Sequence, residues 1–119
     1  MSPLSYPVFQ GVDSNAQITY ILNLFGLSET ELGGLFHVNR QAVNQWRKRS
    51  IPAQRAAQVD RIVEFGQFLQ RRLIPERIPT IVRTPAKGLD GRTMLDVLRT
   101  EGVAPLYRYM ARLAEYSNT

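Results

Sequence analysis

One short stretch, residues 28–49, restricts the fold of this chain more than any other part of the sequence. Ser28 followed three residues later by Glu31 is the pattern of a capping box, which begins a helix. Asn39 is a favourable N-cap for a second helix, which can run to residue 49 because no glycine or proline interrupts it. Only residues 37–39 separate the two helices. We therefore predict a tightly connected helical pair that buries a shared apolar face.

The remaining sequence also has helical periodicity, and no segment alternates apolar and polar residues as a strand does. Gly26 is expected to end the first helix, and Ser50 and Thr93 are expected to cap two later ones. The further predicted helices cover 15–25, 53–73, 78–83, the stretch between Thr93 and Gly102, and about 105–115. The predicted fold class is therefore all-α.

Three regions follow from this pattern. Residues 1–14 form an irregular N-terminal segment. Residues 15–73 form a helix-turn-helix domain with a long connecting helix, because two short helices joined by a three-residue turn, the second one basic, are typical of that motif. Residues 74–119 form a small helical domain.

The distribution of charge favours a polyanionic partner. The net charge is +5, and residues 37–59 contain five Lys or Arg and no acid, whereas residues 1–36 contain no Lys or Arg. Cations confined to one element can neutralise phosphates and release their counterions. A solvated basic face without any partner would have the same composition, so charge alone leaves both interpretations open.

Composition also argues against several classes of protein. The chain has no cysteine, which excludes disulfides and thiolate metal sites, and we expect no metal site, no cofactor and no catalytic residue, because no nucleophile–base pair or paired carboxylates can be recognised. No apolar run approaches the ~18 residues of a membrane span, and the N-terminal residues lack the pattern of a signal peptide. We expect a soluble cytoplasmic protein that does not bind a membrane.

The second helix of the pair has a polar face suited to DNA. On a helical wheel this face lies opposite the stripe formed by Val43 and Trp46. Side-chain amides can pair bidentately with adenine, and an arginine in the first turn can reach guanine or a phosphate. The expected base-reading residues are Arg40, Gln41, Asn44 and Gln45. The expected phosphate contacts are Ser28, Arg47, Lys48 and Arg49.

Residues 28–52 resemble the Cro/repressor-type (Xre) helix-turn-helix family. The positions that carry the resemblance are Leu32, Gly33, Phe36, Val38, Val43 and Trp46. The resemblance implies a Cro/repressor-like domain that binds double-stranded operator DNA. That family usually has glycine at the turn, where this chain has His37, so we predict a positive φ for His37. Trp46 is expected to be a core anchor.

The C-terminal region resembles the toxin-binding domain of Xre/MbcA/ParS-type antitoxins, and the combined resemblance covers about residues 28–115. The matching segments are Arg83-Thr84-Pro85, Leu89, Gly91-Arg92-Thr93 and Leu95-Asp96-Val97-Leu98. The resemblance implies an antitoxin that represses its own operon and neutralises a RES-type toxin, which consumes NAD or transfers ADP-ribose. The expected toxin contacts are Leu89, Asp90, Gly91, Arg92, Thr93 and Tyr116.

Other interpretations of the C-terminal region remain open. From the residues alone it is a dimerisation or partner-binding region, in which Asp90, Arg92 and Asp96 could form a local salt-bridge cluster. The chain could then be a stand-alone repressor, and an enzyme is the least favoured class. A homodimer is expected because two half-sites are usually read together. The candidate self-association surface is formed by Phe65, Phe68, Leu69, Leu106, Tyr109 and Leu113, which could instead join the two halves into one core.

Overall fold

The computed structural model describes residues 13–117, with side chains to residue 115. Within this range the chain is all-helical, as predicted, and its β-structure is limited to one isolated bridge between Ala86 and Arg92. The α-helices are α1 (Ser14–Phe25), α2 (Glu29–Leu35), α3 (Arg40–Lys48), α4 (Ala53–Arg72), α5 (Ile78–Arg83), α6 (Met94–Thr100) and α7 (Ala104–Ser117). Two short 3-10 helices are η1 (Pro75–Arg77) and η2 (Lys87–Leu89). Most of the segment predicted to be irregular, 1–12, lies outside the described residues.

Helix ends follow the predicted caps in most cases. The capping box of Ser28 and Glu31 begins α2, and Thr93 forms a second capping box with Asp96 at the start of α6. Asn39 caps α3 by accepting from the backbone N–H of Ala42 at 2.9 Å. Gly26, with φ 66°, ends α1.

The predicted Ser50 cap is wrong. The N-cap of α4 is Pro52, and it makes no side-chain capping bond. The reason is the burial of Ile51, whose side chain is only 6% exposed and whose N–H donates to Ser14 Oγ at 2.9 Å. The chain has to pass Ile51 through the core before it can turn into a helix, so α4 starts three residues after Ser50.

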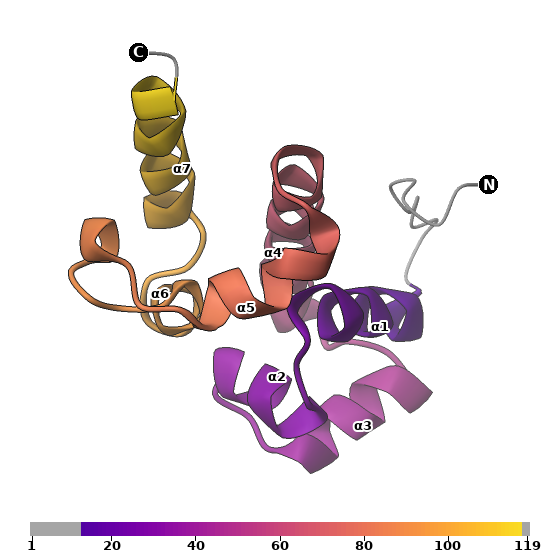
Figure 1. Cartoon of the computed structure of the whole chain (residues 1–119). Coiled ribbons are helices and arrows are strands. Elements are labelled where there is room, and N and C mark those ends of the chain that lie inside the picture. Colours follow the sequence, from indigo (N-terminus) through magenta and orange to yellow (C-terminus); the bar gives the residue numbers. More distant parts are fainter. Residues whose placement is uncertain (1–12, 118–119) are drawn as a thin grey trace.

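The helices α1, α2 and α3 gather at one end of the molecule, α4 and α5 lie beside α1, and α7 projects at the opposite end (Figure 1). Contacts cross the predicted domain boundary at 73–74, because α5 packs against α1 and α6 packs against α2. A single hydrophobic cluster includes fully buried side chains from both halves, such as Phe36 and Leu106. The two predicted domains therefore share one core.

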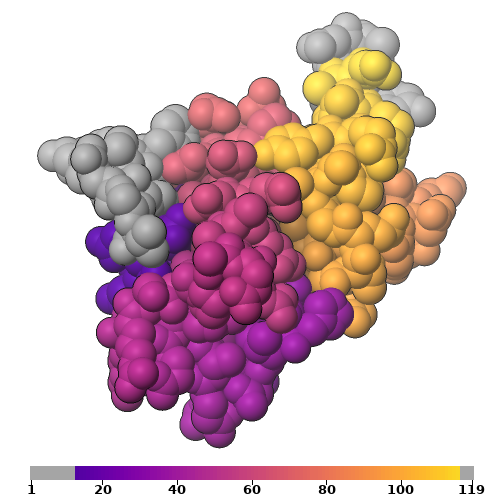
Figure 2. All heavy atoms as spheres, turned by 180° about the vertical axis from the view of Figure 1, so that it is seen from behind, coloured from indigo at the N-terminus to yellow at the C-terminus, as the bar shows by residue number. Residues whose placement is uncertain are grey.

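The broad apolar face of α4 is covered within the chain. Phe65 and Leu69 are fully buried, and the rings of Phe65 and Phe68 both meet Tyr107 of α7 edge-on, with centroids 5.3 and 4.8 Å apart. Seen from behind, α4 lies against the surface formed by α6 and α7, and the end of α7 stands out from the body (Figure 2). The apolar residues Phe65, Phe68 and Leu69 of α4 therefore join the two halves of the chain. Of the residues predicted to form a self-association surface, only Leu113 is well exposed, at 41%.

Candidate nucleic-acid interface

The α2–α3 pair is built around close packing. Val43 is fully buried and Trp46 is 5% exposed, with its ring edge-on to Phe36 at a centroid distance of 5.6 Å. A Cβ atom added to Gly33 would lie 2.6 Å from the carbonyl oxygen of Val38, so only glycine allows α2 to approach the start of α3 this closely. Trp46 is thus the core anchor that the sequence predicts.

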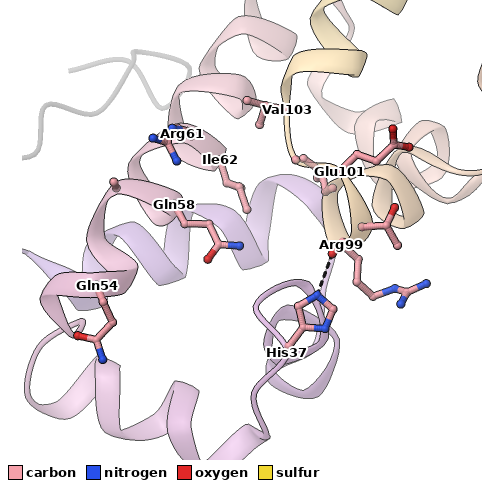
Figure 3. Close-up of a pocket in the computed structure, with 12 residues that line it drawn as sticks. His37, Gln54, Gln58, Arg61, Ile62, Arg99, Glu101 and Val103 are labelled. Atoms are coloured by element: carbon pink, nitrogen blue, oxygen red, sulfur yellow. Dashed lines mark hydrogen bonds between the residues drawn. The ribbon is translucent and has the colours of Figure 1, made fainter.

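The turn between α2 and α3 is held by two contacts from later elements. His37 has φ 59°, which confirms the predicted left-handed conformation, and its Nε2 lies 2.9 Å from the carbonyl oxygen of Arg99 (Figure 3). Because a carbonyl can only accept, Nε2 carries the proton in this contact. The second contact comes from Arg55 of α4, which donates to the carbonyl oxygen of Phe36, directly before His37, at 2.9 Å.

The outward face of α3 has the polar character expected for base reading. Arg40, Gln41 and Gln45 are exposed and Asn44 is half-buried. These four residues and Glu29 of α2 line a shallow hollow of about 440 Å³. The helix α3 lies at the edge of the molecule, at the end away from α7 (Figure 1).

Arg47 differs from the sequence-based expectation of a phosphate contact. Its guanidinium donates to Asn15 of α1 at 2.8 Å, to Thr19 of α1 at 3.0 Å and to Glu29 of α2 at 3.0 Å. All of its donating groups therefore face the protein, and its side chain is only 28% exposed. We assign Arg47 to joining α1, α2 and α3, whereas Lys48 and Arg49 are exposed at the end of α3.

Both acids of α2 are paired with arginines within the chain. Glu29 and Glu31 are the only acidic residues between Asp13 and Asp60. Glu29 pairs with Arg47, and Glu31 pairs with Arg83 of α5 at 2.6 Å. The hydrogen bond from Arg83 lowers the pKa of Glu31 to about 2, helped by the backbone hydrogen bond from Ser28.

The exposed cations of α3 stay unpaired. Within the described side chains, no ion pair involves Arg40, Lys48 or Arg49. The hydroxyl of Ser28 is bound to the N–H of Glu31 as an acceptor and can still donate. Among the described residues, α3 and its C-cap thus carry three exposed cations without an ion-pair partner.

The loop expected to contact a toxin is a closed structural unit. Leu89 is only 4% exposed, so it belongs to the core and the expectation that it contacts a partner is corrected. Backbone N–H groups of Leu89 and Gly91 both donate to the carbonyl oxygen of Ala86. Asp90 and Gly91 are exposed and both have positive φ, of 57° and 80°.

Arg92 and Thr93 have partners inside the chain. The Arg92 guanidinium forms an ion pair with Glu101 and also donates to the carbonyl oxygen of Leu89 at 3.2 Å. The ion-pair partner of Arg92 is thus Glu101, whereas the sequence suggested Asp90 and Asp96. Thr93 caps α6 through Asp96. The side chain of Tyr116 lies outside the described residues.

Sequence reasoning missed the contacts of Arg83 and Arg55. In the sequence, Arg83 is notable only as part of the Arg-Thr-Pro segment, and nothing in that segment indicates a partner 52 residues away. Glu29 and Glu31 lie in a stretch without Lys or Arg, so the sequence indicates only that a partner of either acid comes from elsewhere in the chain, and not which residue it is.

Residues 13–117 contain no group of three or more His, Asp or Glu side chains that could hold a metal ion, and none of their helices is long and apolar enough to cross a membrane. Comparisons of the chain with known protein families, with curated proteins and with solved structures gave no match. The function therefore has to be argued from the residues and their geometry.

Proposed function

We propose that the chain is a DNA-binding regulator in which α2 and α3 form a Cro/repressor-type helix-turn-helix, with α3 in the major groove. Gln41, Asn44 and Gln45 read base edges, and Arg40 reaches guanine or a phosphate. Ser28, Lys48 and Arg49 contact the phosphate backbone. A homodimer on two half-sites supplies the specificity that one short helix lacks.

One observation carries this proposal: the outward face of α3 combines exposed amides with unpaired cations. The neighbouring helix α2 adds no unpaired acid to this surface. Here both acids of α2 are bound by arginines, one from α3 and one from α5. This arrangement favours a polyanionic partner over a solvated basic face, because it removes the charges that would repel phosphates.

We further propose that the chain is the antitoxin of a type II toxin–antitoxin pair and that its C-terminal region binds a RES-type toxin. Support comes from the resemblance of residues 83–98 and from the exposed Asp90 and Gly91 at the tip of the loop. Neither DNA binding nor toxin binding requires the chain to catalyse a reaction. The alternative is a stand-alone repressor whose C-terminal region serves the shared core and dimerisation only.

The DNA-binding proposal is tested by the salt dependence of binding. Fluorescence anisotropy with a labelled duplex of random sequence should give an affinity that falls steeply with salt. Lys48→Ala and Arg49→Ala should each reduce the slope by about 1. The matched control is Arg77→Ala, which removes an exposed cation from η1, away from α3. Equal slopes for all three variants would contradict the proposal.

The toxin proposal needs a separate measurement. The full chain is co-expressed with a RES-type protein encoded beside it and recovered by affinity purification. Asp90→Arg should weaken recovery because it reverses the charge at the exposed tip of the loop, whereas Asp60→Ala in α4 should not. No recovery of the wild-type pair would favour the stand-alone repressor.

A further inference from the structure

Arg83, in the C-terminal half of the chain, binds the N-terminal end of α2. The guanidinium donates to both carboxylate oxygens of Glu31, at 2.6 and 2.9 Å, and to the carbonyl oxygen of Gly26 at 2.6 Å. Glu31 is also the capping-box residue that binds the backbone N–H of Ser28. One side chain of α5 therefore fixes both the α1–α2 connection and the first turn of α2.

A second contact joins the C-terminal half to the other end of α2. The His37 ring lies on the turn before α3 and donates to the carbonyl oxygen of Arg99, next to the C-terminal end of α6 (Figure 3). This contact borders a hollow of about 440 Å³ between α4 and the α6–α7 junction. In Figure 3 the Gln58 and Ile62 side chains point into this space.

Apolar side chains also join α2 to the C-terminal half. Leu35 of α2 and Leu95 of α6 both line a smaller open hollow of about 170 Å³, together with Leu27 and Gly34. The two polar contacts, one at each end of α2, fix its position relative to α5 and α6.

We infer that Arg83 and His37 are positioning residues for the proposed DNA-binding surface, so that the affinity of α3 for DNA depends on the placement of α5 and α6. The inference rests on the proposed function. It assigns the C-terminal half a role in DNA binding that is separate from binding any protein partner.

The experiment uses the full chain and two readouts. The first is hydrogen exchange of the amides of residues 27–38, which needs no DNA. The second is affinity for a duplex selected by the wild-type chain, at fixed salt. Arg83→Ala should speed exchange at these amides and weaken DNA binding about threefold to tenfold, the range typical of a coupling contact. Arg83→Lys keeps the charge but not the forked geometry of the guanidinium, so its exchange rate and DNA affinity should lie between those of the wild type and of Arg83→Ala.

A matched control comes from the ion pair of Arg92 and Glu101. The side chains of that pair are 40% and 45% exposed, and those of Arg83 and Glu31 are 40% and 42% exposed. Glu101→Ala therefore removes a similar ion pair that does not touch α2, and it should change neither readout. If Arg83→Ala and Glu101→Ala behave alike in either readout, the inference about Arg83 is overturned.

His37 is tested with a substitution that favours the turn itself. Glycine adopts a φ of 59° without strain, so His37→Gly should preserve the backbone of the turn while losing the contact with Arg99. We expect faster exchange and weaker DNA binding in spite of the relieved backbone. Affinity equal to or better than that of the wild type would show that His37 only forms the turn, and would overturn its positioning role. If the wild-type chain selects no DNA, the proposed function fails, and the exchange readout alone decides whether the C-terminal half holds α2.

Discussion

Two adjacent glycines of α2 give a sharp test of the packing between α2 and α3. Alanine stabilises a helix interior by about 0.5–1 kcal/mol relative to glycine. At Gly34 a new Cβ meets nothing within 4 Å, so Gly34→Ala should gain that amount. At Gly33 the new Cβ would lie 2.6 Å from the carbonyl oxygen of Val38 and 3.3 Å from that of Asn39. Both are backbone atoms at the start of α3, so the helices would have to separate.

The expected difference between the two variants is large enough to measure. Overpacking typically costs about 1–3 kcal/mol, which leaves Gly33→Ala destabilised by roughly 0.5–2 kcal/mol after the helix gain. Each kcal/mol moves the melting temperature of a chain of this size by about 4 °C. Thermal unfolding followed by circular dichroism should therefore show Gly34→Ala above the wild type and Gly33→Ala below it, with DNA binding weakened only in Gly33→Ala. Equal melting temperatures for the two variants would refute the close approach of α2 and α3.

The remaining predictions concern single side chains. Arg47→Ala should lower stability by about 1–3 kcal/mol in urea unfolding, because it leaves Glu29 without its partner, whereas Lys48→Ala should change stability by less than about 0.5 kcal/mol. Trp46→Ala should cost about 3–5 kcal/mol in the same assay, and a cost below 1 kcal/mol would contradict its place in the core. The pKa of Glu31 is lowered from 4.5 to about 2, so its ion pair stabilises the fold fully above pH 4.5 and loses that effect as the pH falls toward 2. The difference in stability between the wild type and Arg83→Ala, about 1 kcal/mol at pH 7 for this exposed pair, should therefore shrink over that range of pH, and a constant difference would argue against the pair.

Local features of this chain could be predicted from the sequence because they depend on neighbouring residues. The capping boxes at Ser28 and Thr93 involve side chains three positions apart, and the positive φ of His37 follows from the family resemblance, in which glycine is usual at this turn position. The burial of Trp46 follows from the helical period. Such features need no knowledge of how distant helices pack.

The features that were missed depend on long-range packing. A helical wheel places Arg47 at the edge of the DNA face, but it cannot show that Asn15 and Thr19 of α1 lie within reach of its guanidinium. Leu89 lies in a glycine-flanked loop, and such a sequence predicts an exposed side chain. The loop is closed by its own backbone hydrogen bonds, however, and the Leu89 side chain is buried in the core. The Arg83–Glu31 pair spans 52 positions and has no local signature.

The central claim, that α3 reads base sequence, is tested most directly by selecting duplexes from a random pool with four full-length proteins. Wild type should yield one preferred half-site. Gln41→Ala and Gln45→Ala should each lose preference at one position per half-site, at a cost of about 1–3 kcal/mol, and keep it elsewhere. The matched control, Gln54→Ala in α4, removes an exposed glutamine outside α3 and should select the wild-type sequence. If Gln41→Ala and Gln45→Ala also select the wild-type sequence unchanged, α3 does not read DNA in the way proposed.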